Sequence, residues 1–125
     1  MSAACAVVLA ASLAAHQHHV PTDVLVAIAY HESRLRPTAR GDDGKSWGPW
    51  QINTAVHRLQ CRSLRCQSDY AARMLRRNMG RTRTLGGAVQ LWNSRNRGYA
   101  LRVLAKRAKV WQIIRRCSFR MEESR

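Results

Sequence analysis

The sequence predicts a mainly α-helical domain that carries one small β element. Helix signals dominate, because proline and acidic residues mark helix starts and apolar residues recur near the helical spacing in the last part of the chain. Glycine and proline gather in one stretch, residues 40–53, which reads RGDDGKSWGPWQIN. The 125 residues contain no repeat, linker or internal boundary, so we expect one domain over residues 1–125. A content of 46% hydrophobic and 23% charged residues excludes a disordered chain.

The N-terminal segment is apolar and rich in alanine, which admits two interpretations. Residues 3–15 resemble the core of a signal peptide, but no Lys or Arg precedes them. We therefore expect residues 1–15 to belong to a first helix over 3–18 rather than to a cleaved signal peptide. Pro21 at an early helical position and Asp23 in the first turn start a second helix that ends near Ser33.

The rest of the chain gives three more helices and a loop or short hairpin. The Asp43-Gly44 pair marks a turn within residues 40–53. Ser68 is the expected N-cap of a helix over 69–79 that Gly80 ends, and Thr84 caps one over 85–94. The last helix covers 97–115 and is followed by a C-terminal tail, residues 116–125. Its apolar positions, near 3.6 spacing, are Ala100, Val103, Leu104, Ala108, Trp111 and Ile114.

The charge is strongly positive and unevenly distributed. The net charge is +15, and the first 33 residues contain no Lys or Arg. Such a field favours anionic partners, which include nucleic acids, acidic lipids and the anionic polymers of a bacterial cell envelope. The basic residues are not interleaved with aromatic ones, as they are on nucleic-acid stacking platforms, so we expect envelope polymers. The cationic segment 99–120 makes a membrane surface a secondary partner, and we expect a monomer.

Four cysteines leave the redox state open. Cys5, Cys61, Cys66 and Cys117 lack the clustered Cys/His pairs of a zinc site, and we assign no metal and no cofactor. Among the three pairings, Cys61–Cys66 with Cys5–Cys117 is the simplest, and free buried thiols are the other interpretation.

Glu32 occupies an unusual place for a carboxylate. It lies four residues after Ile28 and eight after Val24, so it continues the apolar stripe at the C-terminal end of the second helix. Burial and the negative end of the helix dipole both raise the pKa of an acid placed there. A carboxyl group that stays protonated near neutral pH is what a general acid requires. The alternative is an ordinary helix-end glutamate paired with a nearby arginine.

The flanks of Glu32 resemble a known family. Glu32-Ser33, then Pro37 and Ala39, then Gly48-x-x-Gln51-Ile52-Asn53 are similar to the motifs of the soluble lytic transglycosylase domain, a member of the lysozyme superfamily. The approach VPTDVLVAIAYHES is similar to its helix, and the segment Leu91–Arg95 is the counterpart of its A-Y-N-A-G motif. The resemblance extends from about residue 4 to 115. It implies a lysozyme-like, mainly α (α+β) fold with about five to six helices and a small β-hairpin that lines a glycan groove.

The resemblance also implies roles for individual residues. Glu32 matches the catalytic acid/base, and Ser33 the serine beside it. Gly48 and Gln51 match the groove motif, Asn93 matches the family asparagine, and Ser46 and Asn53 accompany them as substrate-binding residues. Trp92 stands where the family has a tyrosine whose hydroxyl contacts the glutamate, and an indole N–H donates but cannot accept. Trp47 is a candidate wall for sugar stacking, whereas we expect Trp50 and Trp111 to lie in the core.

The implied substrate is peptidoglycan, which would be cleaved at the MurNAc–GlcNAc β-1,4 bond. The protein would act on the bacterial cell wall from the periplasm, from outside the cell or as part of a phage. One carboxylate is enough for a lytic transglycosylase that forms a 1,6-anhydro product. Hydrolysis usually needs a second carboxylate, for which Asp42 and Asp43 are the candidates, although both also suit the turn at Gly44. A hydrolytic muramidase and a non-enzymatic basic binding protein are therefore the alternatives.

Overall fold

The computed structural model describes the backbone of residues 1–123 and the side chains of residues 1–118. Within this part, a three-stranded antiparallel sheet in the order β1-β2-β3 accompanies the helices, so the mainly α (α+β) class is confirmed. The α-helices are α1 (Ala3–His18), α2 (Thr22–Ser33), α3 (Thr54–His57), α4 (Leu64–Thr82), α5 (Leu85–Gln90), α6 (Tyr99–Leu104) and α7 (Arg107–Glu123). The strands are β1 (Arg40–Gly41), β2 (Ser46–Trp47) and β3 (Ile52–Asn53), and 3-10 turns cover Asp42–Gly44 and Leu91–Asn93.

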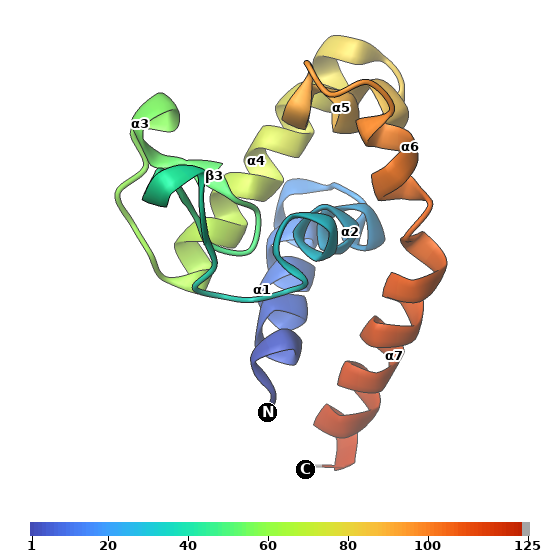
Figure 1. Cartoon of the computed structure of the whole chain (residues 1–125). Helices are drawn as coiled ribbons and strands as arrows, with labels where there is room; N and C mark the ends of the chain where they lie inside the picture. Colours follow the sequence, from blue (N-terminus) through green and yellow to red (C-terminus); the bar gives the residue numbers. More distant parts are fainter. Residues whose placement is uncertain (124–125) are drawn as a thin grey trace.

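Helix α2 lies at the centre of the molecule. The hairpin and α3 lie to one side of it, and α6 and α7 lie to the other (Figure 1). Its residues from Val24 to Ala29 are all fully buried, because α1, α4, α6 and α7 pack around it. A helix that is apolar all round suits such a position. Burial of α2 holds its last turn, which carries Glu32, at a fixed place beside the hairpin.

The first two helices begin and end where the sequence predicts. The Ser2 side chain accepts a hydrogen bond from the backbone N–H of Cys5 at 3.1 Å, which caps α1. His19 ends α1 in the left-handed conformation, and α2 begins directly after Pro21. The buried face of α1 packs against α4 and α2.

The predicted bounds of the two middle helices are partly wrong. Helix α4 begins at Leu64 because Ser63, rather than Ser68, caps it by accepting from the N–H of Cys66 at 3.2 Å, and it runs through Gly80 to Thr82. A glycine inside a helix costs only about 1 kcal/mol relative to alanine, which packing offsets. The predicted helix 85–94 changes to a 3-10 turn after Gln90.

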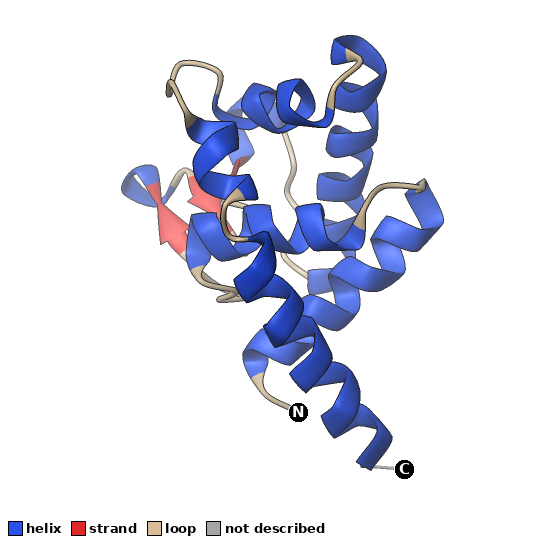
Figure 2. Cartoon of the chain, turned by 90° about the vertical axis from the view of Figure 1, so that its right-hand side faces the viewer, coloured by secondary structure: helices blue, strands red, loops and turns tan. Residues whose placement is uncertain are grey.

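The last predicted helix is divided into two. A break at Ala105 and Lys106 separates α6 from α7, and α7 continues to Glu123 through most of the expected tail. Figure 2 shows α7 on the outside of the molecule. Val110 and Cys117 face inward, whereas Trp111 is 47% exposed, so its assignment to the core is wrong. Because of the break, the apolar positions predicted for one continuous helix do not all face the core.

Both cysteine pairs of the simplest predicted connectivity are present. Cys5 on α1 is bonded to Cys117 on α7, and Cys61 to Cys66 at the start of α4. The first bond ties together the two ends of the chain, which lie near one another in Figure 1. The second closes a small loop next to the hairpin.

An ion pair between a buried aspartate and an exposed arginine joins α2 to α7. The carboxylate of Asp23 is 7% exposed and accepts from Nε and Nη2 of Arg107 at 2.8 and 2.7 Å. We expect Arg107→Ala to lower the free energy of unfolding by about 1–3 kcal/mol, because it leaves a buried carboxylate without its partner. Urea denaturation measures the change, and the exposed Arg115 on the same helix, changed to Ala, is the matched control. Equal stability of the two variants would contradict a structural role for the pair.

Candidate functional site

A polar cleft of about 290 Å³ lies where the end of α2 meets the hairpin, α3, α4 and the 3-10 turn at Leu91–Asn93. It brings together seven of the residues predicted for the site: Glu32, Asp42, Ser46, Gln51, Asn53, Trp92 and Asn93. Ile52, His57 and Met74 complete the lining and were not predicted. His57 and Met74 follow no local motif, so only the folded arrangement identifies them.

Glu32 is the half-buried carboxylate of this cleft. Burial raises the pKa of Glu32, and the nearby charge of Asp42 raises it further. A hydrogen bond from Tyr99 acts in the opposite direction and only partly offsets the effect of burial. The net shift is upward, so the carboxyl group keeps its proton to a higher pH than an exposed glutamate does.

Tyr99 is the functional residue that the sequence did not reveal. Its hydroxyl donates to Oε2 of Glu32 at 2.5 Å, and its ring is fully buried. Burial and the adjacent Glu32 raise the pKa of Tyr99, so the hydroxyl stays protonated and remains a donor. His31 packs edge-on against the ring at 5.2 Å between centroids. Tyr99 therefore provides the hydroxyl contact that Trp92 cannot.

Trp92 lies at the predicted site. It lines the cleft, and its indole N–H donates to the carbonyl oxygen of Trp50 at 3.4 Å. The tyrosine hydroxyl that contacts Glu32 comes from α6 instead, at Tyr99. Trp50 itself is fully buried and donates to the Leu25 carbonyl at 2.9 Å, which confirms its predicted place in the core.

Both candidate second carboxylates lie in the 3-10 turn between β1 and β2, and only one of them lines the cleft. Asp42 points into the cleft and accepts from the hydroxyl of the buried Ser46 at 2.6 Å. Asp43 is exposed, has a left-handed φ of 57°, and does not line the cleft. Its role is in the turn, and only Asp42 remains a candidate partner for Glu32.

The Gly48 to Gln51 turn shapes the cleft rather than offering free groups to a ligand. The Gln51 side-chain amide donates to the carbonyl oxygens of Gly48 at 2.9 Å and Ala39 at 3.1 Å. Gly48 has a φ of +84°, and a Cβ atom there would lie 2.9 Å from Oε1 of Gln67. Glycine is therefore required at this position by both conformation and space. Gly48 does not line the cleft, which corrects its expected contact with substrate.

Two further predicted residues lie outside the cleft. Ser33 is buried, donates to the Ala29 carbonyl at 3.0 Å and accepts from the N–H of Arg36, so it stabilises the end of α2. Trp47 is only 8% exposed and is covered by Arg40 and Arg62. Neither residue is placed to contact a sugar in this cleft.

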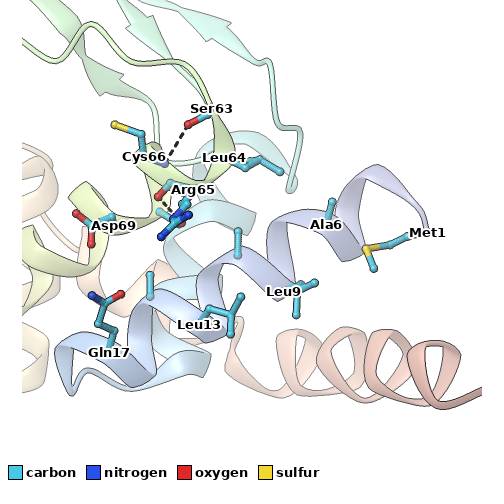
Figure 3. Close-up of a pocket in the computed structure, with 13 residues that line it drawn as sticks. Met1, Ala6, Leu9, Leu13, Gln17, Ser63, Leu64, Arg65, Cys66 and Asp69 are labelled. Carbon is cyan, nitrogen blue, oxygen red and sulfur yellow. Dashed lines mark hydrogen bonds between the residues drawn. The ribbon is translucent and has the colours of Figure 1, made fainter. Parts of the chain in front are cut away.

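A larger apolar groove of about 770 Å³ lies between α1 and the start of α4. Figure 3 shows Leu9 and Leu13 of α1 facing it, with Leu64 and Asp69 of α4 on the other side. Asp69 is its only acid and is held by His18 at 2.6 Å. The smaller cleft, which contains the half-buried Glu32 and most of the predicted site residues, is therefore the candidate active site.

Removal of the Tyr99 hydroxyl isolates its effect on Glu32. We expect Tyr99→Phe to raise the pKa of Glu32, because the hydrogen bond favours the ionised carboxylate. Carbon-13 NMR titration of the glutamate carboxyl group measures this shift, and any reaction that needs protonated Glu32 should persist to higher pH in the variant. Tyr30→Phe, on α2 but outside the cleft, is the control. An unchanged or lowered Glu32 pKa would contradict the assigned role.

Within the described residues, no cluster of His, Cys, Asp or Glu is suited to a metal ion. In the same part of the chain, no helix is long and apolar enough to cross a membrane.

Comparison with protein-family models matches no family, and searches of the curated proteins and of the solved structures give no match.

Proposed function

We propose that this protein cleaves the glycan strands of peptidoglycan at the MurNAc–GlcNAc β-1,4 bond as a lytic transglycosylase. The observation that carries the proposal is that Glu32, a half-buried carboxyl group with a raised pKa, lines a polar cleft and accepts a hydrogen bond from the buried Tyr99. The resemblance of Glu32-Ser33 and the Gly48 to Asn53 segment to the soluble lytic transglycosylase domain supports the same reaction. The mainly helical fold with a small antiparallel sheet is of the α+β class that this resemblance implies.

The proposed reaction uses one carboxyl group twice. Protonated Glu32 donates its proton to the glycosidic oxygen as the bond to the MurNAc anomeric carbon breaks, which leaves an oxocarbenium-like centre. The Glu32 carboxylate then removes the proton of the MurNAc C6 hydroxyl, and that oxygen bonds to the anomeric carbon. The products are a 1,6-anhydro end and a free GlcNAc 4-hydroxyl, and no water is consumed. Glu32 ends in its starting protonation state.

Tyr99 acts as a positioning residue in this scheme. Its donated hydrogen bond orients one oxygen of Glu32 and leaves the other for substrate. The bond also stabilises the carboxylate that exists between the two proton transfers. Buried neighbours hold Tyr99, so the contact is formed before substrate binds.

A hydrolytic muramidase is the second candidate, favoured by the place of Asp42 in the cleft. In that reaction Asp42 would activate a water or bond to the sugar. We expect Asp42→Asn instead to retain cleavage within about tenfold, since loss of a true second carboxylate costs about 10²–10⁴-fold. Activity should also decline at lower pH than in the wild type, because the Asp42 charge raises the pKa of Glu32. Loss of all cleavage in Asp42→Asn would favour the muramidase.

The charge of the chain suits the proposed location. The net charge of +15 would hold the protein on the anionic polymers of a bacterial envelope, with lipid surfaces as a secondary partner and nucleic acid disfavoured. Two disulfides are typical of proteins that work in an oxidising compartment. We therefore propose that it acts in the bacterial cell wall and, as expected from the sequence, as a monomer without a cofactor.

Release of soluble fragments from dye-labelled peptidoglycan tests the proposal. We expect the wild type to release dye in proportion to enzyme and time, and the rate to fall as the pH rises through the pKa of Glu32. Glu32→Gln, which keeps the strongly positive charge, controls on the same substrate for release caused by a cationic protein alone. Binding to peptidoglycan without release would favour the non-enzymatic alternative.

A further inference from the structure

Positive charge gathers around Trp47, outside the cleft that contains Glu32. The guanidinium carbon of Arg62 lies 4.2 Å from the centre of the Trp47 ring, and that of Arg40 lies 5.0 Å from it. Both contacts are favourable cation–π interactions. The two cations are nevertheless within about one Debye length (about 10 Å at 0.1 M salt) of each other, so they repel. An anion placed near them would relieve that repulsion.

A polar pocket of about 470 Å³ adjoins this cluster and shares Arg62 with it. The lining consists of Thr54, Ala55, Arg58, Leu59, Gln60 and Arg62. It thus presents two guanidinium groups and no acidic residue. Among the residues whose side chains are described, the arginines found in ion pairs are Arg73 and Arg107, so Arg58 and Arg62 keep their charge uncompensated.

The backbone that carries these arginines is held in place before any ligand arrives. The disulfide between Cys61 and Cys66 constrains the segment that begins directly before Arg62. The side-chain amide of the buried Gln67 donates to the Cys61 carbonyl at 2.6 Å. Arg58 ends α3 in the left-handed conformation, with a φ of 52°. Such preorganisation lowers the ordering cost of binding.

We propose that this pocket, which we call the α3 pocket, binds an oxyanion, a carboxylate or a phosphate group, through Arg58 and Arg62. Planar guanidinium groups match the geometry of both. The α3 pocket is also next to the cleft, because Asn53 lines the cleft and Thr54, the following residue, lines the α3 pocket. A glycan strand in the cleft would bring its anionic substituents there, either the carboxylates of its peptide stems or the phosphates of a linked polymer. Only this choice of source rests on the proposed function.

Titration with small anions tests the site directly. Nitrogen-15 amide spectra of the wild type would be recorded with glutarate, a dicarboxylate, and separately with inorganic phosphate. We expect the wild-type shifts to be confined to residues 54–62. In Arg58→Gln/Arg62→Gln, which loses two charge-assisted contacts, we expect binding to be about tenfold weaker. The matched control, Arg76→Gln/Arg81→Gln, removes the same charge from exposed positions on α4.

The outcomes of the titration decide the proposal. Shifts on residues 54–62 that persist in the control variant would support the α3 pocket. Tighter binding of glutarate would indicate the stem carboxylates as the source, and tighter binding of phosphate would indicate the phosphate polymer. Shifts spread over all arginines, or an equal loss in the control, would overturn it and leave only diffuse surface charge. The titration needs no catalytic activity, so its result is independent of whether the chain cleaves peptidoglycan.

Kinetics on matched substrates then test the link to the glycan. We expect Arg58→Gln/Arg62→Gln to raise KM about tenfold on glycan strands that carry peptide stems, with kcat unchanged. KM is then measured on strands stripped of their peptide stems and on strands freed of phosphate polymers. The substituent whose removal abolishes the difference in KM between wild type and variant is the source. An equal rise of KM on fully stripped strands would contradict recognition of a substituent. Absence of cleavage by the wild type would instead refute the proposed function and leave the titration result standing.

Discussion

Glu32→Gln is expected to reduce glycan cleavage by about 10³-fold or more, because it removes the one group that both donates and accepts the proton. The substitution keeps the shape of the side chain and an oxygen that can accept from Tyr99. Release of soluble muropeptides at equal protein concentration measures the loss. Asp43→Asn is the matched control, since it neutralises an exposed carboxylate outside the cleft and should leave the rate unchanged. Activity near the wild-type level in Glu32→Gln would refute the assigned role.

The same variant should be folded and, at neutral pH, more stable than the wild type. The folded-state pKa of Glu32 is raised, so the folded protein binds its proton more tightly than the unfolded chain does. Stability of the wild type therefore falls as the pH rises from the unfolded pKa through the folded one. Glutamine does not ionise and escapes this loss. A stability advantage that grows between acidic and neutral pH would show that inactivity is not unfolding.

Loss of the Cys5–Cys117 disulfide is expected to have the largest effect on stability. The bond closes almost the whole chain, with a sequence separation of 112. The chain-entropy relation gives about 4–5 kcal/mol for a loop of this length, which is a large part of the 5–15 kcal/mol typical of a domain. We expect Cys5→Ala/Cys117→Ala to lower the free energy of unfolding by about that amount, as measured by urea denaturation.

The second disulfide supplies the matched comparison. Cys61 and Cys66 are separated by only 5 positions, for which the same relation gives about 2 kcal/mol. Cys61→Ala/Cys66→Ala should therefore retain more of the stability than the other double variant. Equal losses in the two double variants would contradict the loop-length argument. A larger loss of stability in Cys61→Ala/Cys66→Ala than in Cys5→Ala/Cys117→Ala would contradict the same argument.

The parts of the fold that the sequence predicts are those set by neighbouring residues. Ser2, Pro21 and Asp23 act within one turn of their own helices, so α1 and α2 have the expected bounds. Glu32 is found for the same reason, because its place on the apolar stripe depends only on helical spacing. The turn residues Asp43 and Gly44 locate the hairpin between β1 and β2.

The parts that the sequence misses depend on distant contacts. Tyr99 reaches Glu32 across 67 positions, and only the packing of α6 against α2 brings them together. Ala105 and Lys106 are good helix formers, so no local signal marks the break between α6 and α7. Trp47 looked available to a sugar because its cover, Arg62, comes from a loop beyond α3.

The measurement that tests the central claim most directly is a digest of purified peptidoglycan in water enriched in oxygen-18, with products identified by mass spectrometry. We expect the wild type to release 1,6-anhydro muropeptides that contain no oxygen-18, and Glu32→Gln to release none. Reducing-end products that carry oxygen-18 would identify a muramidase and return attention to Asp42. No soluble product from the wild type, or the same products from Glu32→Gln, would contradict the claim that Glu32 cleaves the glycan.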